Sequence, residues 1–331
     1  MLWFFLIFST LSWGIAEIFY KKGNKADEKY SHLKTTVFVG ILMGLYSLII
    51  LCVEDVSIKS LPENFVRYLP VSLCYIVSMT CSYFGVRFIE ESLSDPIENT
   101  SGAVVPILCA IFLHEKLNAV TVVAVIVVAI GILCVGFFDK GGKEHRVKQF
   151  GTRLAIWAIA MPFCYMLLDA IGTFLDIYYT DSVETTLLVN VTEDNLEHTA
   201  NCCYEFTFFI ISMFILAFMK FKKVKLFSLK GEGINEVVCE NGETKKIKWY
   251  QVPLKQKDKI LAAAFETAGQ ATYLFALSEG AGIAAVILGA GTVITSLILS
   301  RIILKEKLSK IQYVFILIIM IGIIMLSLVT A

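Results

Sequence analysis

Charged residues are scarce in this sequence of 331 residues: Asp, Glu, Lys and Arg together make up 18%, whereas hydrophobic residues make up 57%. Soluble globular domains carry roughly 25% charged residues. The mean hydropathy of +0.72 is too high for a chain that buries one core in water, which excludes an ordinary soluble protein. The composition indicates an integral membrane protein with the lipid bilayer as a partner. A formal net charge of zero gives no reason to expect a nucleic-acid partner.

The sequence also lacks the motifs of catalysis and of metal binding. Its four histidines fall in loops or at the ends of apolar segments, and there is no HExxH motif, phosphate-binding glycine loop or nucleophile elbow. The nine cysteines show no zinc-site spacing, and most lie singly in apolar runs. We therefore expect no enzymatic activity, no cofactor and no metal site. An intramembrane enzyme and a receptor or scaffold that does not transport are the alternatives left open.

Long apolar segments dominate what is present, and each is long enough to cross hydrocarbon as a helix. There are ten of them, at residues 2–20, 33–53, 65–88, 97–113, 119–137, 154–178, 204–219, 260–277, 282–304 and 311–330. The first lacks a basic n-region and is interpreted as a retained span, not a signal peptide. The predicted fold class is all-α integral membrane, with about ten transmembrane helices.

The basic residues are distributed unevenly among the loops. All but three of the 29 lysines and arginines fall in the odd-numbered loops, the exceptions being Lys59, Arg67 and Lys116. The positive-inside rule then predicts cytoplasmic odd loops and external termini, in a cell membrane that we expect to be bacterial. A polar loop near 180–203, which ends in a pair of cysteines, is expected outside. A basic loop near 220–259 is expected inside, and its Asn-Gly pair predicts a β-hairpin with a type I′ turn.

An internal repeat organises the spans. Residues 114–135, beginning HEKL, align without gaps with residues 305–326, beginning KEKL, and this alignment pairs Gly131 with Gly322. A repeat of five spans contains an odd number of crossings, so its two copies enter the membrane in opposite orientations. Inverted repeats of this kind are typical of secondary transporters that work by alternating access. The predicted division is a first five-helix repeat at 1–138 and a second at 152–331.

The two five-helix repeats, the Trp13-Gly14 pair, and HEKL and KEKL after the fourth and ninth spans resemble EamA-type members of the drug/metabolite transporter superfamily. The resemblance covers nearly the whole chain. It implies a ten-helix basket with a central cavity, and uptake or export of a small metabolite or drug-like solute. It names no substrate, and it favours internal termini where the charge count favours external ones. The fifth and tenth spans are expected to be structural or to face a second subunit in a homodimer.

Ionisable side chains inside the predicted spans are few, and each is costly in lipid, by about 2.5–3.5 kcal/mol on insertion scales. Glu17 lies one turn after Trp13 in the first span, and Asp169 lies at a nearly equivalent place in the sixth. Both are predicted to line a cavity and to take part in substrate binding or in proton coupling. Asp176 lies near the end of the sixth span and is expected to be solvated.

A polar stripe marks the eighth span, where Glu266, Gln270 and Tyr273 share one helix face. The stripe is interpreted either as a substrate contact or as a helix–helix joint, since polar groups do both in membranes. The candidate site residues are Trp13, Glu17, Tyr83, Asp169, Glu266, Gln270 and Tyr273.

The start of the fourth span is read as a helix N-terminus. Asp95 is predicted to be the N-cap, with Pro96 at the first helical position and Glu98 and Asn99 in the first turn. Glu306, in the KEKL turn, is expected to cap a helix end or to pair with a lysine, away from the substrate.

Overall fold

A computed structural model describes residues 2–113, 118–138, 147–229, 236–238, 244–306 and 309–330. Within these ranges the protein is almost entirely helical. The helices are α1 (Leu2–Gly23), α2 (Ser31–Val53), α3 (Leu61–Gly85), α4 (Glu91–Glu98), α5 (Ser101–Phe112), α6 (Ala119–Phe137), α8 (Thr152–Thr180), α9 (Leu196–Phe221), α10 (Lys257–Leu299) and α11 (Lys310–Thr330). Short elements complete the chain, namely strands β1 (Glu236–Val238) and β2 (Thr244–Lys246) and helical turns η1 (Trp249–Gln251), η2 (Pro253–Gln256) and η3 (Ser300–Leu304).

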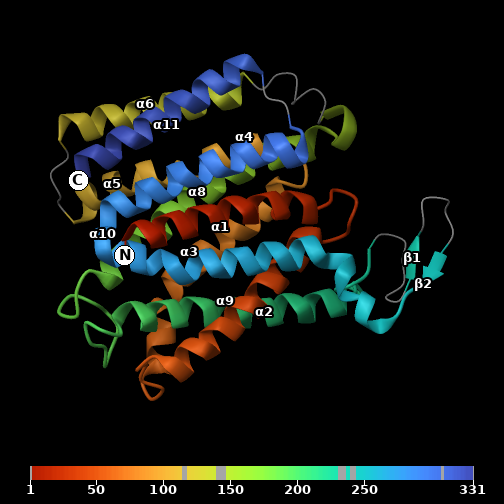
Figure 1. The fold of residues 1–331 in the computed structure, drawn as a ribbon, viewed down its shortest axis with the longest axis horizontal. Coiled ribbons are helices and arrows are strands. Elements are labelled where there is room, and N and C mark those ends of the chain that lie inside the picture. The colour runs from red at the N-terminus through yellow and green to blue at the C-terminus, as the bar shows by residue number, and fades with distance from the viewer. Residues whose placement is uncertain are drawn as a thin grey trace.

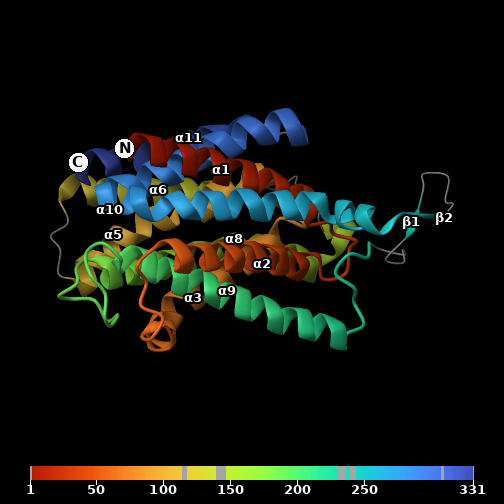
Figure 2. The same ribbon diagram turned by 60° about the horizontal axis from the view of Figure 1, so that its bottom comes forward.

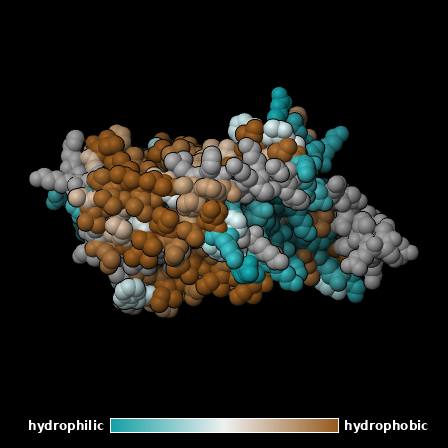
Figure 3. All heavy atoms as spheres, turned by 90° about the horizontal axis from the view of Figure 1, so that it is seen from above, coloured by the Kyte–Doolittle hydropathy of each residue, from teal (hydrophilic) through white to brown (hydrophobic). Residues whose placement is uncertain are grey.

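The helices have the length and the surface of membrane spans. Five of them, α1, α2, α3, α8 and α9, are long and apolar enough to cross a membrane, and shorter apolar stretches lie in α6, α11 and the end of α10 with η3. Figure 3 shows apolar side chains over most of one face, with hydrophilic ones gathered toward one end. A multi-pass all-α membrane protein is therefore confirmed, while the count of about ten spans stays a prediction.

Helix α10 is helical over 43 residues, which would be about 65 Å if it were straight. Its two limbs instead run in opposite directions, as Figure 1 shows. Four contacts with α1 establish the reversal: Lys259 with Gly23, Gly269 with Trp13, Gly291 with Thr10, and Thr295 with Gly14. The first limb is thus antiparallel to α1 and the second is parallel to it. The predicted spans at 260–277 and 282–304 agree with two limbs of opposite direction, and the structure differs from the prediction in that residues 278–281 between them are helical too.

Helix packing agrees with the two repeats. Helix α1 packs along α10, α3 along α8, α2 along α9, and α6 along α11. Exchanging the repeats turns the α1–α10 pair into the α8–α3 pair and maps the other two pairs onto themselves. The glycines paired by the repeat lie where α6 and α11 touch, because a Cβ on Gly131 would come 2.6 Å from Ile319 Cγ1 and one on Gly322 would come 2.5 Å from Val128 Cγ2.

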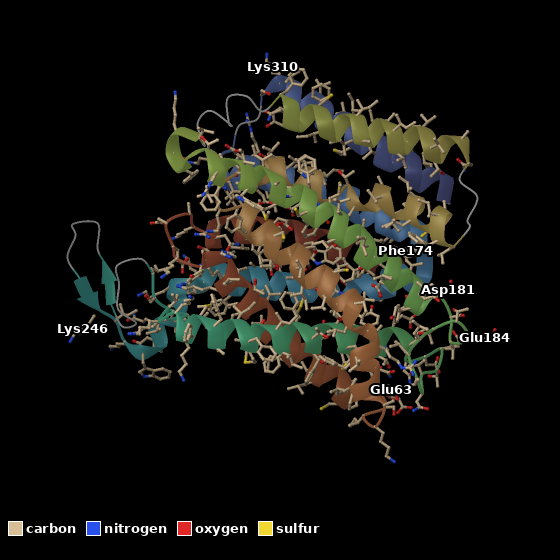
Figure 4. The ribbon with its side chains drawn as sticks, turned by 180° about the vertical axis from the view of Figure 1, so that it is seen from behind. Glu63, Phe174, Asp181, Glu184, Lys246 and Lys310 are labelled. Atoms are coloured by element: carbon tan, nitrogen blue, oxygen red, sulfur yellow. The ribbon has the colours of Figure 1, made fainter. Side chains whose placement is uncertain are left out.

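The loops segregate by charge. The N- and C-termini lie at one end of the molecule and the β1–β2 hairpin projects from the other in Figures 1 and 2. Figure 4 places Lys246 toward the hairpin end and Glu63, Asp181 and Glu184 toward the opposite end. The antiparallel pairing of β1 with β2, with Val238 opposite Thr244, confirms the predicted hairpin, whereas its Asn-Gly turn lies outside the described residues. The membrane side of each end stays a prediction.

The fourth predicted span differs from its prediction. It consists of two helices, α4 and α5, that are separated at Asn99-Thr100. Asp95 is not an N-cap. It lies inside α4, and its carboxylate accepts hydrogen bonds from Asn99 Nδ2 at 2.7 Å and from Ser296 Oγ. The cap comes from far along the chain: Glu306 accepts hydrogen bonds from the first amides of α4, those of Glu91 and Ser92, at 3.0 and 2.9 Å. The capping role predicted for Glu306 is confirmed.

Helix α9 also begins earlier than predicted, at Leu196. The adjacent Cys202 and Cys203, expected in a polar loop, are therefore buried within the helix as free thiols. Ser47 Oγ of α2 lies 3.3 Å from the Cys202 sulfur.

Candidate functional site

A cavity of about 120 Å³ lies among the helices of both repeats. Its walls come from α1, α3, α4, α5, α8, α9 and α10. An apolar cavity of about 150 Å³ holds benzene, so this one has room for a single small solute. The structure brings all seven candidate residues to its walls, namely Trp13, Glu17, Tyr83, Asp169, Glu266, Gln270 and Tyr273. Their role in binding a substrate stays a prediction.

A chain of hydroxyl groups positions the carboxylate of Glu266. Tyr83 Oη of α3 donates to Tyr20 Oη of α1 at 3.0 Å, and Tyr20 Oη donates to Glu266 Oε2 of α10 at 2.9 Å. The two tyrosine rings pack with centroids 4.4 Å apart. Three helices thus hold one carboxylate through neutral partners. The sequence did not single out Tyr20, because a tyrosine in an apolar span usually packs in a core.

A second set of tyrosines surrounds Asp176, which the sequence placed at a solvated helix end. Asp176 is instead buried, and its carboxylate accepts hydrogen bonds from Tyr68 Oη and from Tyr75 Oη, the latter at 3.4 Å. Tyr75 Oη also lies 3.2 Å from Thr173 Oγ1. Tyr75 and Thr173 line the cavity, so Asp176 supports this wall from behind. The prediction failed because tyrosine hydroxyl groups of α3 reach this end of α8.

Four carboxyl groups line the cavity, from four different helices: Glu17, Glu98, Asp169 and Glu266. Glu98 accepts a hydrogen bond from Ser94 Oγ at 2.6 Å, and the hydroxyls of Ser101 and Tyr165 lie against Asp169. Among the described residues that form the walls, none is Lys, Arg or His. The cavity therefore holds four acids without a fixed positive charge.

Glu98 and Asn99 are wall residues that the sequence reading assigned to a helix N-terminus. The sequence does contain a pattern that indicates a polar role for this segment. Glu91, Asp95 and Glu98 are spaced i, i+4, i+7, which places acids on one helix face. Such a face is out of place at the edge of an apolar span unless it meets a polar interior.

Two buried polar atoms at the cavity have no hydrogen-bond partner within the described part of the chain. They are Glu17 Oε2 and Thr292 Oγ1, both on residues that line the walls. The Thr292 side chain is only 2% exposed. Buried polar groups are normally paired, so these atoms mark positions where a bound molecule can donate or accept. The described residues contain no group of three or more His, Cys, Asp or Glu arranged to hold a metal.

A further buried carboxylate lies outside the cavity, in the loop between α1 and α2. Glu28 contacts Lys34 Nζ at 2.7 Å and Lys259 Nζ at 2.6 Å, and all three side chains are 2–3% exposed. Gln256 Nε2 also donates to Glu28, at 2.9 Å. Burial alone would raise the pKa of Glu28, but the two ammonium groups lower it to about 2. We call these four side chains the Glu28 cluster, which joins the α1–α2 loop to the start of α10.

Comparison with known proteins adds a family. The model of the EamA-like transporter family matches residues 1–137 and 185–328, which leaves α8 between the two matched segments. No curated protein matches the chain. Of the seven candidate residues, all but Asp169 fall within the matched segments.

Proposed function

Because this chain belongs to the EamA-like transporter family, and is thus a multi-pass membrane transporter of small solutes, we propose that it moves its solute through the central cavity by alternating access. The observation that carries the proposal is that both repeats build the cavity walls. Glu17 and Tyr83 come from the first, and Glu266 and Tyr273 from the second. A tilt of one repeat against the other would therefore change the end at which the cavity opens.

The proposed topology has ten crossings. Helices α4 and α5 together make one broken crossing, and the two limbs of α10 make two, so that the first repeat spans 1–138 and the second 152–331. The clustering of basic loops at the hairpin end supports a cytoplasmic position for that end and an external position for both termini. The test is a reporter that is active only in the cytoplasm, fused after Ala331. Activity of this fusion would overturn the proposed orientation.

The carboxyl groups of the cavity give it a means of coupling. Glu17 and Asp169 can bind a positive charge in one state and release it in the other, and this charge is either a proton or part of the solute. Glu17 supports this role because its Oε2 is buried without a partner among the described residues. Asp169 supports it because hydroxyl groups alone lie against its carboxyl.

The proposal is tested by filling the cavity. A Cβ added at Gly102 meets no described atom within 4 Å, and Gly102 lines the wall, so a side chain at this position starts in open space and the ring of Gly102→Phe is expected to occupy the cavity. We expect this variant to fold and to lose the uptake of labelled solutes into proteoliposomes, measured with a panel of neutral, anionic and cationic compounds.

The matched control is Ile111→Phe, which places the same ring on the same helix where the side chain is 59% exposed. It should transport as the unmodified protein does. Undiminished flux through folded Gly102→Phe would show that the solute does not pass through this cavity.

A further inference from the structure

The charge balance of the cavity is unusual for a buried site. The polar partners of its carboxyl groups among the described residues are all neutral: Tyr20 and the Trp13 indole at Glu266, Ser94 at Glu98, and Ser101 and Tyr165 at Asp169, whereas Glu17 Oε2 has none. A buried carboxylate without a countercharge is costly, so it is normally neutralised by a proton or paired with a cation. The protein supplies no cation from the described residues of the walls. The site is therefore short of positive charge.

Glu28, outside the cavity, is a buried carboxylate whose countercharge comes from the protein itself. At Glu28 two lysines lie within 2.7 Å of the carboxylate oxygens. The interior of this protein therefore does accommodate lysine beside a buried carboxylate, and the described walls of the cavity contain none. A fixed ammonium group there would occupy the space of a ligand.

Aromatic rings cover the same walls. The rings of Trp13 and Tyr273 lie 5.1 Å apart, and those of Tyr75 and Tyr204 lie 5.6 Å apart. The negative faces of such rings attract cations, and they do so most effectively for alkylated ammonium groups, whose charge is spread over apolar carbon. A proton gains nothing from aromatic walls, and a hard metal ion requires several oxygen ligands in place of rings. Carboxylates together with rings match an organic ammonium ion.

The size and the remaining polar atoms narrow the ligand further. A volume of about 120 Å³ is close to the roughly 150 Å³ that accommodates benzene. The unpartnered Thr292 hydroxyl, which is buried at the wall, can meet one polar group besides the ammonium. The apolar body of the ligand is thus about one ring in size.

We propose that the cavity binds a small organic cation, an amine or quaternary ammonium ion whose apolar body is about one ring, between the cavity carboxylates and the aromatic walls. This inference rests on the proposed function in taking the cavity as the solute site. It goes beyond that function in fixing the charge and the size of the solute.

The test is equilibrium binding of tritiated benzyltrimethylammonium to the purified full-length protein in detergent. This probe carries a permanent charge and cannot deliver a proton. We expect saturable binding. Benzylamine should compete at least about tenfold better than benzyl alcohol, the change that about 1.4 kcal/mol produces, and benzoate should not compete. Equal competition by the three compounds, or preference for benzoate, would overturn the proposal.

Variants locate the binding. Glu17→Gln and Asp169→Asn should each weaken binding by about tenfold or more, and Trp13→Leu by a smaller factor. The matched control is Glu205→Gln, which neutralises a fully buried carboxyl group outside the cavity walls. This variant should bind the probe as the unmodified protein does. Thermal unfolding shows whether each variant is folded. If Glu17→Gln fails to fold, Asp169→Asn and Trp13→Leu still decide the outcome.

The outcomes separate this inference from the proposed function. If Gly102→Phe blocks solute flux but the protein does not bind benzyltrimethylammonium, the proposed transport stands and the proposal of a cationic solute is refuted. If binding is saturable but no solute is transported, the proposal of a cation-binding cavity is supported and the proposed transport is refuted.

Discussion

Glu28 and the four cavity carboxyl groups are the same chemical group in two different surroundings. Glu28 is held between Lys34 and Lys259 in a cluster that is almost inaccessible to solvent. The cavity acids, represented by Glu17, have hydroxyl partners or none among the described residues. Glu98 and Glu266 are buried as Glu28 is, whereas Glu17 and Asp169 are half-buried at the cavity. The difference lies in the origin of the positive charge.

This difference separates structure from function within one chain. A carboxylate whose countercharge comes from the protein is fixed in one arrangement and can contribute to folding. A carboxylate without a countercharge is a poor structural element, since its burial is not offset. The Glu28 cluster is therefore a structural joint between the two repeats, whereas in the cavity, as we propose, a positive charge arrives and leaves.

The largest expected effect comes from breaking the joint. Glu28→Gln leaves two buried ammonium groups without their partner, which should lower the free energy of unfolding by about 3–5 kcal/mol. The measurement is thermal or denaturant unfolding in detergent. A control is Glu63→Gln, which removes an acid from the exposed pair with Arg67, where the side chains are 57% and 41% exposed. That change should cost at most about 1 kcal/mol.

Equal losses in the two variants would mean that the Glu28 cluster contributes no more than a surface ion pair. In that case its burial would be incidental, and the contrast between joint and cavity would fail.

A somewhat smaller effect is expected from pH. The pKa of Glu28 falls from its ordinary value of 4.5 to about 2 in the folded protein. Above about pH 4.5 the acid is ionised in both states and its contribution to stability is complete. Between pH 4.5 and 2 only the unfolded state takes up the proton, so stability is lost as the pH falls. At about 1.4 kcal/mol per pKa unit, the total loss is about 3 kcal/mol.

Comparing unmodified protein with Glu28→Gln isolates this group from other acids. Their difference in unfolding free energy should be constant between about pH 5 and 7, below the lowered pKa of Lys259 of about 8, and should shrink as the pH approaches 2. A difference that stays constant down to pH 2 would show that Glu28 does not have its pKa lowered by the lysines.

The part of the candidate site that could be predicted from the sequence is its acidic residues within apolar spans. Glu17, Asp169 and Glu266 are conspicuous because an acid in an apolar span is costly, and all three line the cavity. Tyrosines such as Tyr20 and Tyr75 are not conspicuous, since an aromatic ring is equally at home in a packed core. Their roles became visible only when the helices placed hydroxyl groups beside carboxylates.

Other features depended on contacts between distant parts of the chain. Glu28 and Lys259 are 231 positions apart, and in sequence both belong to polar loops that look solvated. The start of α4 was misread for the same reason, because its cap is Glu306 from the other repeat. Residues 278–281 were expected to separate two helices, but they are helical, and the chain reverses its direction within α10.

The smallest change in stability without ligand is expected for Glu17→Gln, and this variant gives the most direct test of the central claim. The claim is that the cavity acids lack a partner until a cation binds. Unfolding temperatures are measured for unmodified protein, Glu28→Gln and Glu17→Gln, each without and with benzyltrimethylammonium, since ligand binding raises apparent stability. Without the probe, Glu17→Gln should stay within about 1 kcal/mol of the unmodified protein, whereas Glu28→Gln falls well below it. With the probe, Glu28→Gln should still be stabilised and Glu17→Gln should not. Stabilisation of Glu17→Gln equal to that of the unmodified protein, or a baseline loss as large as that of Glu28→Gln, would contradict the account.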